Sequence, residues 1–183
     1  NHENANYVIG NFMLAIEKGS ADGFSHIGDL YRLGYQSITV DYNKALHYYN
    51  LDTSNSITKH FGLAILNLSG NGLPQNTLEA IKHLSIVAGR TDKNMQMVGV
   101  PHVTEQLCKI YSEKTYNMED KIKAHMWCTV TAQSEDNLFL KSIYEEKRLA
   151  IAMSMNKSQL EESTRLLKRC KDSGFFLSCG LPM

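Results

Sequence analysis

One pattern of residues occurs three times along the chain, and this repetition constrains the fold more than any other feature. Each copy carries a small residue, then an Asn or Asp, and then an alanine with a ring-bearing side chain three residues later. The copies span residues 28–48, 64–83 and 108–127. They follow one another after about 35 and about 44 residues, a period typical of stacked helix pairs rather than of a single closed core.

Proline and apolar residues both favour helices. The three prolines are Pro74, Pro101 and Pro182, and each lies outside the strongly periodic segments. Apolar residues recur at three- and four-residue spacing, for instance over 24–33 and 143–167, whereas strict alternation is nearly absent. The sequence therefore predicts an all-α fold.

The residue types within each copy suit a helical hairpin. A small residue in the first helix and alanine in the second allow the two helices to approach closely. These positions are Gly28, Ala64 and Cys108 in the first helices, and Ala45, Ala80 and Ala124 in the second helices. The rings expected to pack between layers are those of Tyr31, Tyr48, Tyr111 and Trp127.

Turn residues predict where these helices end. Gly34 and Gly70 are expected to end the first helices in the left-handed conformation that glycine adopts at low cost. Asp41, Asn76 and Asp120 are expected to cap the second helices.

Together these residues resemble the Sel-1-like repeats, relatives of the tetratricopeptide solenoids. The resemblance covers nearly the whole chain, because 15–22 looks like a link between repeats and 123–167 looks like the helices that close bacterial members. The sequence departs from the family pattern at Asn67, where Tyr is usual, and at Lys114, where Gly is usual. The resemblance implies a right-handed α-α superhelix, or solenoid, with a C-terminal capping helix pair.

On this basis we predict a single repeat domain over 1–183. Its predicted parts are a partial N-terminal unit at 1–19, repeats at 20–55, 56–91 and 92–134, capping helices at 135–170 and a tail at 171–183. The third repeat carries an insertion at 93–103.

Charge and hydropathy exclude two classes of partner. The sequence has 19 Lys and Arg residues against 19 Asp and Glu residues, so no net basic field attracts nucleic acid. Its longest apolar stretches are interrupted well short of the roughly 20 residues that a membrane-spanning helix needs. We therefore expect neither nucleic-acid binding nor membrane insertion.

No motif predicts catalysis, a cofactor or a metal site. The seven histidines show no His-Glu-x-x-His motif and no pair at metal-ligand spacing. Residues 70–72 lack the Lys-Ser or Lys-Thr of a phosphate loop and suit a turn. We expect a non-enzymatic protein.

Partner binding is what the resemblance implies, on a concave surface lined by the first helices. The corresponding inward positions of the first repeat include Ser25, Asp29 and Arg32, and those of the third repeat include Glu105 and Lys109. These positions are polar, so they suit the rim of an interface.

The second repeat differs, because its inward positions include Phe61, Ile65 and Leu68. An apolar centre with a charged rim is typical of a protein-binding hot spot. A register shifted by one residue would instead make these three residues core. Met95 and Met97 in the insertion are either adaptable contact residues or a cover for the widened gap between repeats.

The four cysteines allow two disulfides. Cys170 and Cys179 could pin the tail to the last helix, and short bacterial periplasmic members of the family often end in this way. We favour that pair, which places the protein in the periplasm or outside the cell, with the cytoplasm as the alternative. Cys108 and Cys128 could join the third hairpin, or could both be small buried residues.

Three functional hypotheses remain for a chain expected to be monomeric in isolation. The leading one is a partner-binding module, in a specific version an immunity protein that neutralises a toxin of a type VI secretion system. An adaptor or a secreted effector that engages a host protein is the second. The third is a cysteine-rich Sel-1-like hydrolase acting on a cell-wall or β-lactam substrate.

Overall fold

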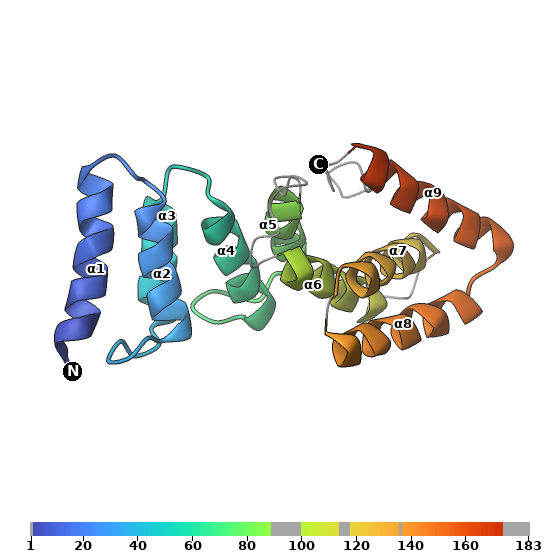
Figure 1. The fold of residues 1–183 in the computed structure, drawn as a ribbon, viewed down its shortest axis with the longest axis horizontal. Coiled ribbons are helices and arrows are strands. Elements are labelled where there is room, and N and C mark those ends of the chain that lie inside the picture. Colours follow the sequence, from blue (N-terminus) through green and yellow to red (C-terminus); the bar gives the residue numbers. More distant parts are fainter. Residues whose placement is uncertain (1, 89–99, 114–117, 136, 174–183) are drawn as a thin grey trace. The chain divides into compact units, whose positions relative to one another are not determined.

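The computed structural model describes residues 2–88, 100–113, 118–135 and 137–173. These ranges contain α1 (His2–Glu17), α2 (Gly23–Leu33), α3 (Tyr42–Leu51), α4 (Ile57–Ser69), α5 (Thr77–Ala88), α6 (Val100–Glu113), α7 (Met118–Ser134), α8 (Leu138–Met153) and α9 (Lys157–Ser173) (Figure 1). The all-α prediction is confirmed. Among the described residues, β-type pairing is limited to an isolated bridge between Tyr35 and Ile38.

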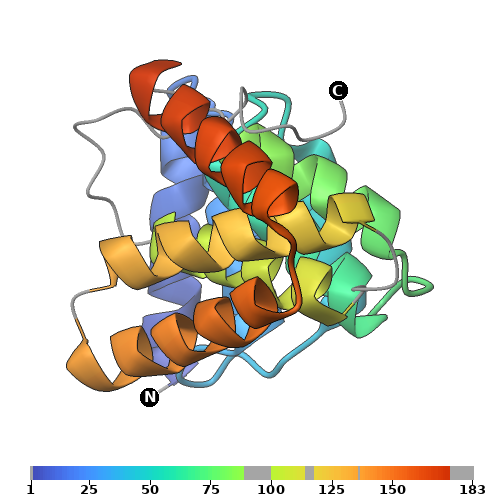
Figure 2. The same cartoon turned by 90° about the vertical axis from the view of Figure 1, so that its right-hand side faces the viewer.

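The chain divides into two compact units, Asn1–Leu84 and Ser85–Met183. In the first unit, α2 packs against α1, α3 and α4. In the second unit, α7 packs against α6, α8 and α9 (Figure 2). Helix α5 begins in the first unit and ends in the second.

Capping residues define the helix ends of the first unit largely as predicted. The Asp41 carboxylate accepts from the backbone N–H of Lys44 at 3.0 Å, and Asn76 Oδ1 accepts from the N–H of Glu79 at 3.1 Å. Gly70 has the predicted left-handed conformation, with φ 72° and ψ 18°. Gly34 also has a positive φ of 74°, but its ψ of 139° lies outside the left-handed helical region. The chain therefore extends toward α3 at this point instead of closing a tight cap.

A tyrosine fills the space between α2 and α4. Tyr49 is fully buried, and a Cβ atom added to Gly28 of α2 would lie 2.6 Å from its ring atom Cε1. A Cβ atom added to Gly62 of α4 would lie 2.3 Å from its hydroxyl oxygen. Two glycines on different helices thus make room for one ring.

The sequence pattern had assigned a ring between layers to Tyr48, the neighbour of this tyrosine. Tyr48 is instead partly exposed and stacks on Tyr31, with ring centroids 5.6 Å apart. Since both positions carry the same residue type, the pattern could not distinguish the ring that enters the core from the one that covers it.

Helix α7 is the centre of the second unit. Its nine successive residues from Ala124 to Ala132 are all buried, because α6, α8 and α9 each cover part of its surface. Trp127 is completely buried, as the repeat pattern predicted. The hydroxyl groups of two buried threonines of α7 are hydrogen-bonded within the helix. Thr129 Oγ1 donates to the His125 carbonyl at 2.7 Å, and Thr131 Oγ1 donates to the Trp127 carbonyl at 2.9 Å.

Two predictions about the third repeat are corrected. Asp120 does not precede the second helix, because α7 already begins at Met118, and its carboxylate lies in the first turn, where a negative charge favours the helix dipole. The predicted insertion at 93–103 ends earlier, since α6 begins at Val100. Pro101 is compatible with this start because a first-turn residue needs no backbone N–H donor.

Candidate partner-binding site

The structure divides the predicted contact residues between helices α2, α4 and α6. Ser25, Asp29 and Arg32 lie on α2, Phe61, Ile65 and Leu68 lie on α4, and Glu105 and Lys109 lie on α6. Met95 and Met97 lie outside the described residues. The α2 and α4 residues belong to the first unit, and the α6 residues belong to the second.

Ser25 is not a surface residue. It is completely buried, and its hydroxyl donates to the Asp52 carboxylate at the end of α3. The expectation that Ser25 contacts a partner is wrong, because the loop between α3 and α4 covers this side of α2.

Asp52 is the centre of a buried hydrogen-bond cluster that joins three helices. Its carboxylate accepts from Ser25 of α2, from the backbone N–H of Ser54 at 2.7 Å, and from the hydroxyl of Ser56, the N-cap of α4, at 2.6 Å. Burial alone would raise the pKa of Asp52, but these hydrogen bonds together lower it below its usual value. The cluster is a structural device that sets α4 relative to α2 and α3.

Asp29 and Arg32 form a partly buried network with the core tyrosine. The Arg32 guanidinium donates to Asp29 at 2.8 Å and to the Tyr49 hydroxyl at 3.0 Å, and Tyr49 donates to Asp29 at 2.6 Å. Burial raises the pKa of Tyr49, and the nearby Asp29 carboxylate raises it further. Both charged side chains keep some exposure at the surface, so they can border an interface while they hold the tyrosine ring in place.

Phe61, Ile65 and Leu68 form the least buried face of α4, together with Thr58. Their neighbours on the helix, including Leu63, Ala64 and Leu66, are buried. The three apolar residues are partly buried rather than fully exposed. They therefore lie on the solvent-facing side of α4, as a shallow row of half-covered side chains. We call Phe61, Ile65 and Leu68 the α4 row.

A histidine pair connects α4 with α5 beside this row. His60 and His83 approach through their Nδ1 atoms at 2.8 Å, and His60 also bonds Asn55 through Nε2. Burial lowers the pKa of His83, and Lys59 and Lys82 lower it further, while Glu79 opposes them. Only one of two facing ring nitrogens can carry a hydrogen in an N–H···N bond, so the pair is intact when at least one ring is neutral.

Glu105 and Lys109 pair with each other on α6 at 2.8 Å. Glu105 also bonds the buried Tyr144 of α8, whose pKa is raised by burial and by this carboxylate. Glu105 therefore also links α6 to α8 through this bond, whereas the Lys109 side chain is exposed. Of the two residues, Lys109 is better placed to contact a partner.

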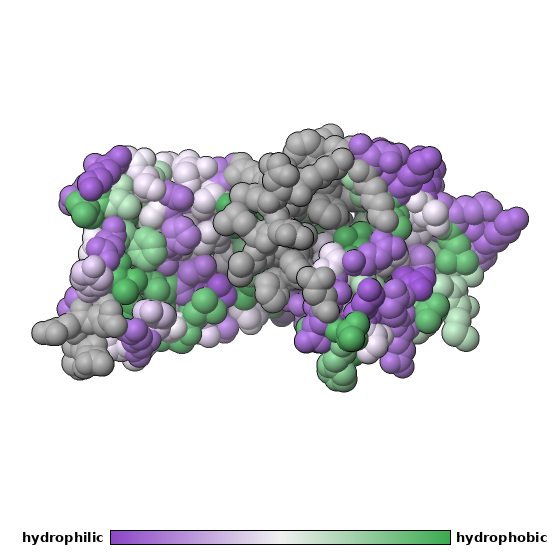
Figure 3. Space-filling view, viewed as in Figure 1, coloured by the Kyte–Doolittle hydropathy of each residue, from purple (hydrophilic) through white to green (hydrophobic). Residues whose placement is uncertain are grey.

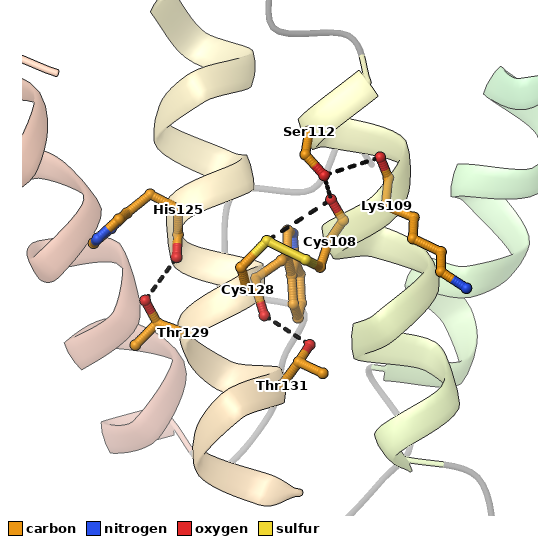
Figure 4. Close-up of a disulfide and its surroundings, with 8 residues drawn as sticks. Cys108, Lys109, Ser112, His125, Cys128, Thr129 and Thr131 are labelled. Carbon is orange, nitrogen blue, oxygen red and sulfur yellow. Dashed lines mark hydrogen bonds between the residues drawn. A yellow bond between two sulfur atoms is a disulfide. The ribbon is translucent and has the colours of Figure 1, made fainter. Parts of the chain in front are cut away.

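A disulfide joins the two helices of the third hairpin. Cys108 of α6 and Cys128 of α7 are bonded, with Cα atoms 4.8 Å apart (Figure 4). This is the pair that the sequence ranked second, and the helices bring it together because both residues are buried on facing sides. The favoured tail pair is not described, since Cys179 lies outside the described residues. Cys170 is buried beside Met126, with 3.9 Å between their sulfur atoms.

Helix α8 has an exposed apolar face that the sequence pattern did not predict. Figure 3 shows hydrophobic residues at the surface where Figure 1 draws this helix. The large apolar residues of α8 that are exposed are Leu138, Phe139, Leu140, Ile143, Leu149 and Met153. A signal was present, because apolar residues occur on more than one side of this segment, whereas a surface helix usually has a single apolar stripe.

Two comparisons by sequence return nothing. No family model matches the chain, and no curated protein matches it. Comparison of structures does find proteins of similar fold. The protein c5321 is described as a protective antigen present in uropathogenic Escherichia coli strains and displaying an SLR fold; it matches with a TM-score of 0.67 and 21% identity. The chain has the Sel1-like repeat fold. The match covers 98% of this chain but only 35% of that protein.

A second Sel1-like neighbour is a Sel1 repeat protein from Oxalobacter formigenes, with a TM-score of 0.50 and 18% identity over 85% of this chain and 67% of that one. At these identities the likeness concerns the fold alone. The resemblance drawn from the repeated residue pattern is confirmed, and with it the α-solenoid class.

In the described part of the chain, every helix falls short of the length and apolar character that a membrane span requires. No group of three or more His, Cys, Asp or Glu side chains there could hold a metal ion.

Proposed function

We propose that the protein is an interaction module that binds a partner protein on the concave side of its repeats, with the α4 row at the centre of the contact. The Sel1-like repeat fold supports this role, because stacked helical hairpins present extended surfaces suited to protein partners. The single observation that carries the site is the α4 row itself, three partly exposed apolar side chains that share the least buried face of α4.

Two hydrogen-bonded networks of the first unit suit an interface. Asp29 and Arg32 are held in a fixed geometry by their bonds to Tyr49, so little side-chain entropy is lost when a partner contacts them. The Asp52 cluster fixes the start of α4 in the same way. A preformed surface of this kind binds without a large ordering cost.

The test is affinity capture from the native organism, followed by reconstitution with the purified partner. The variant is Phe61→Ala, Ile65→Ala, Leu68→Ala, and the matched control is Leu78→Ala, which truncates an exposed leucine of α5. We expect the triple variant to lose the partner at least tenfold in affinity while circular dichroism shows retained helix content. Equal affinity of the folded triple variant would refute this site.

The finer proposal is toxin immunity, with the partner a secreted toxin whose active site is occluded. It predicts that co-expression of this protein restores growth of cells that produce the toxin, and that the triple variant does not. Capture of a host protein or of a bacterial assembly component would instead favour a secreted effector or an adaptor. The same proposal places the protein in the periplasm or outside the cell, which fractionation of the native organism tests.

We also propose a non-enzymatic role, and hydrolysis remains the alternative of another class. Two Ser-x-x-Lys segments occur, and both have structural roles. Ser56 caps α4 and donates to Asp52, while Lys59 Nζ donates to the Asp52 carbonyl at 2.6 Å. Ser154 donates to the Ile151 carbonyl at 2.8 Å. Turnover of a β-lactam or peptidoglycan fragment that disappears in Ser56→Ala, with the fold retained, would overturn this proposal.

A further inference from the structure

The outer face of α8 is an uncovered apolar surface on a helix that is already packed on its other side. Tyr144 and Ile151, two turns apart, are buried on the inner side. Phe139, Leu149 and Met153 lie on the opposite side and are 72%, 52% and 89% exposed. Ser142 and Glu146 lie between them in the sequence, and the five residues follow one another at intervals of three or four. All five therefore lie in one stripe along the helix.

The exposed apolar residues of α8 are clustered rather than scattered singly over the surface. Leu138 and Ile143 flank it and are also exposed. From Phe139 to Met153 the stripe is about 21 Å long at 1.5 Å per residue, which is about four helical turns. Exposed apolar residues thus lie at both ends of the stripe, with Ser142 and Glu146 between them. Clustered exposed apolar residues mark an interaction site more often than single ones do.

A single carboxylate lies at the middle of the stripe. Glu145 is paired with Arg148 at 2.7 Å, whereas Glu146, one residue later and on the outer face, has no ion pair among the described residues. A partner that covers the stripe removes water from this carboxylate, and an unpaired buried charge is costly. The partner must therefore supply a cation opposite Glu146.

These observations distinguish between the occupants that an apolar helix face could have. A lipid surface would bury the stripe but would leave the Glu146 charge uncompensated at the centre of the apolar side. A second copy that pairs antiparallel about the middle of α8 would bring two Glu146 side chains together. A helix with a Lys or Arg in its apolar stripe covers the apolar residues of α8 and also supplies a cation opposite Glu146.

We infer that the outer face of α8 docks an amphipathic helix of about four turns whose apolar stripe is interrupted by one basic residue. This contact is separate from the α4 row and does not depend on it. Apolar burial by Phe139, Leu149 and Met153 supplies affinity, and the Glu146 charge selects the partner.

The test uses two synthetic peptides of 18 residues, each an amphipathic helix with a leucine and alanine stripe. They differ only at the centre of the stripe, which carries Arg in one peptide and Glu in the other. Fluorescence anisotropy with the full chain measures the affinity of both. We expect the Arg peptide to bind about tenfold more tightly, the effect of one close charge pair.

Variants then test which residues are responsible. Glu146→Lys should reverse the preference between the two peptides, and Met153→Glu with Leu149→Glu should weaken both. Leu78→Glu, at an exposed leucine of α5, is the control and should change neither affinity. Since all these side chains are exposed, circular dichroism should show an unchanged helix content.

Several results would overturn the proposal. They are equal binding of the two peptides by the wild-type chain, binding of neither, or no reversal in Glu146→Lys. Sedimentation that shows a dimer abolished by Met153→Glu would assign the face to a second copy. Binding to vesicles of neutral phospholipid that is lost in the same variant would assign it to a lipid surface.

Discussion

In the first unit a tyrosine ring fills the space between two helices, whereas in the second unit a disulfide joins the two helices of a hairpin. Tyr49 lies against Gly28 and Gly62, and its hydroxyl is bonded to Asp29 and Arg32. The second unit has Cys108 bonded to Cys128, on helices that also bury Trp127. Repeats of the same kind are therefore stabilised by shape and hydrogen bonds in the first unit and by a covalent bond in the second.

The difference teaches where each unit is vulnerable. Close packing of a ring against glycine backbone tolerates no added atoms. A covalent link tolerates small changes of packing but depends on oxidising conditions. Four predictions test this contrast, beginning with the largest effect.

Trp127→Ala should destabilise the second unit by about 3 to 5 kcal/mol, because it leaves a large cavity around a completely buried side chain. Urea unfolding followed by circular dichroism measures the loss. Leu149→Ala, which truncates an exposed residue, is the control and should cost much less. A loss below about 1 kcal/mol for Trp127→Ala would contradict the central position of α7.

Removal of the Cys108–Cys128 bond should cost about 3 kcal/mol, since the bond closes a loop with a sequence separation of 20 residues. The measurement compares the unfolding midpoint of the wild type with that of Cys108→Ala, Cys128→Ala. Reductant should lower the midpoint of the wild type and leave the double variant less affected. An identical response of both proteins would show that this bond contributes nothing.

Gly62→Ala should destabilise the first unit by about 1 to 3 kcal/mol, because the new methyl group overlaps the Tyr49 ring. Gly10→Ala in α1 is a matched control, since a Cβ atom there meets nothing within 4 Å. The control should be neutral or stabilise by up to about 1 kcal/mol through helix propensity. In a Tyr49→Leu background the penalty of Gly62→Ala should shrink, and an undiminished penalty would place the clash elsewhere.

Acid should destabilise both units through the partly buried His83 and the buried His125, with a smaller effect than these substitutions. Burial lowers the pKa of His83 in the first unit; it also lowers that of His125 in the second, where Arg148 adds to the effect. The unfolded chain therefore binds more protons than the folded chain below the ordinary histidine pKa of about 6.5. Stability is complete above this pH and decreases as the pH falls below it.

The first unit should show the larger part of this dependence, because double protonation also breaks the His60–His83 bond. Urea midpoints between pH 7.5 and 5 measure it for wild type, His83→Gln and His125→Gln. We expect His83→Gln to flatten the profile more. A profile that is equally steep in all three proteins would exclude these histidines as its cause.

Much of the fold was predictable from local residue patterns. The period near 35 residues, the small residues at the hairpin contacts and the caps Asp41 and Asn76 are local features, and they led to the right fold class. The likeness to the Sel1-like fold agrees with them at only 21% identity. Local features suffice here because each repeat contacts mainly its neighbours.

The candidate site was less predictable, for a physical reason that Ser25 and the α4 row illustrate. Both were assigned to an inner surface by the family resemblance together with helix spacing, yet Ser25 is buried under a loop and the α4 row is half covered. Helix periodicity defines which residues share a face, but the exposure of that face depends on the chain that packs beside it.

The sequence by itself determined that this protein is a stack of helical hairpins, and it named some of the residues that cap and space them, Asp41 and Asn76 among them. Only the tertiary structure decided which of two adjacent tyrosines enters the core, which cysteine pair the described hairpin brings together, and that α8 keeps an apolar side uncovered. These outcomes depend on how neighbouring helices meet, because a side chain one position along a helix points about 100° away and meets a different neighbour.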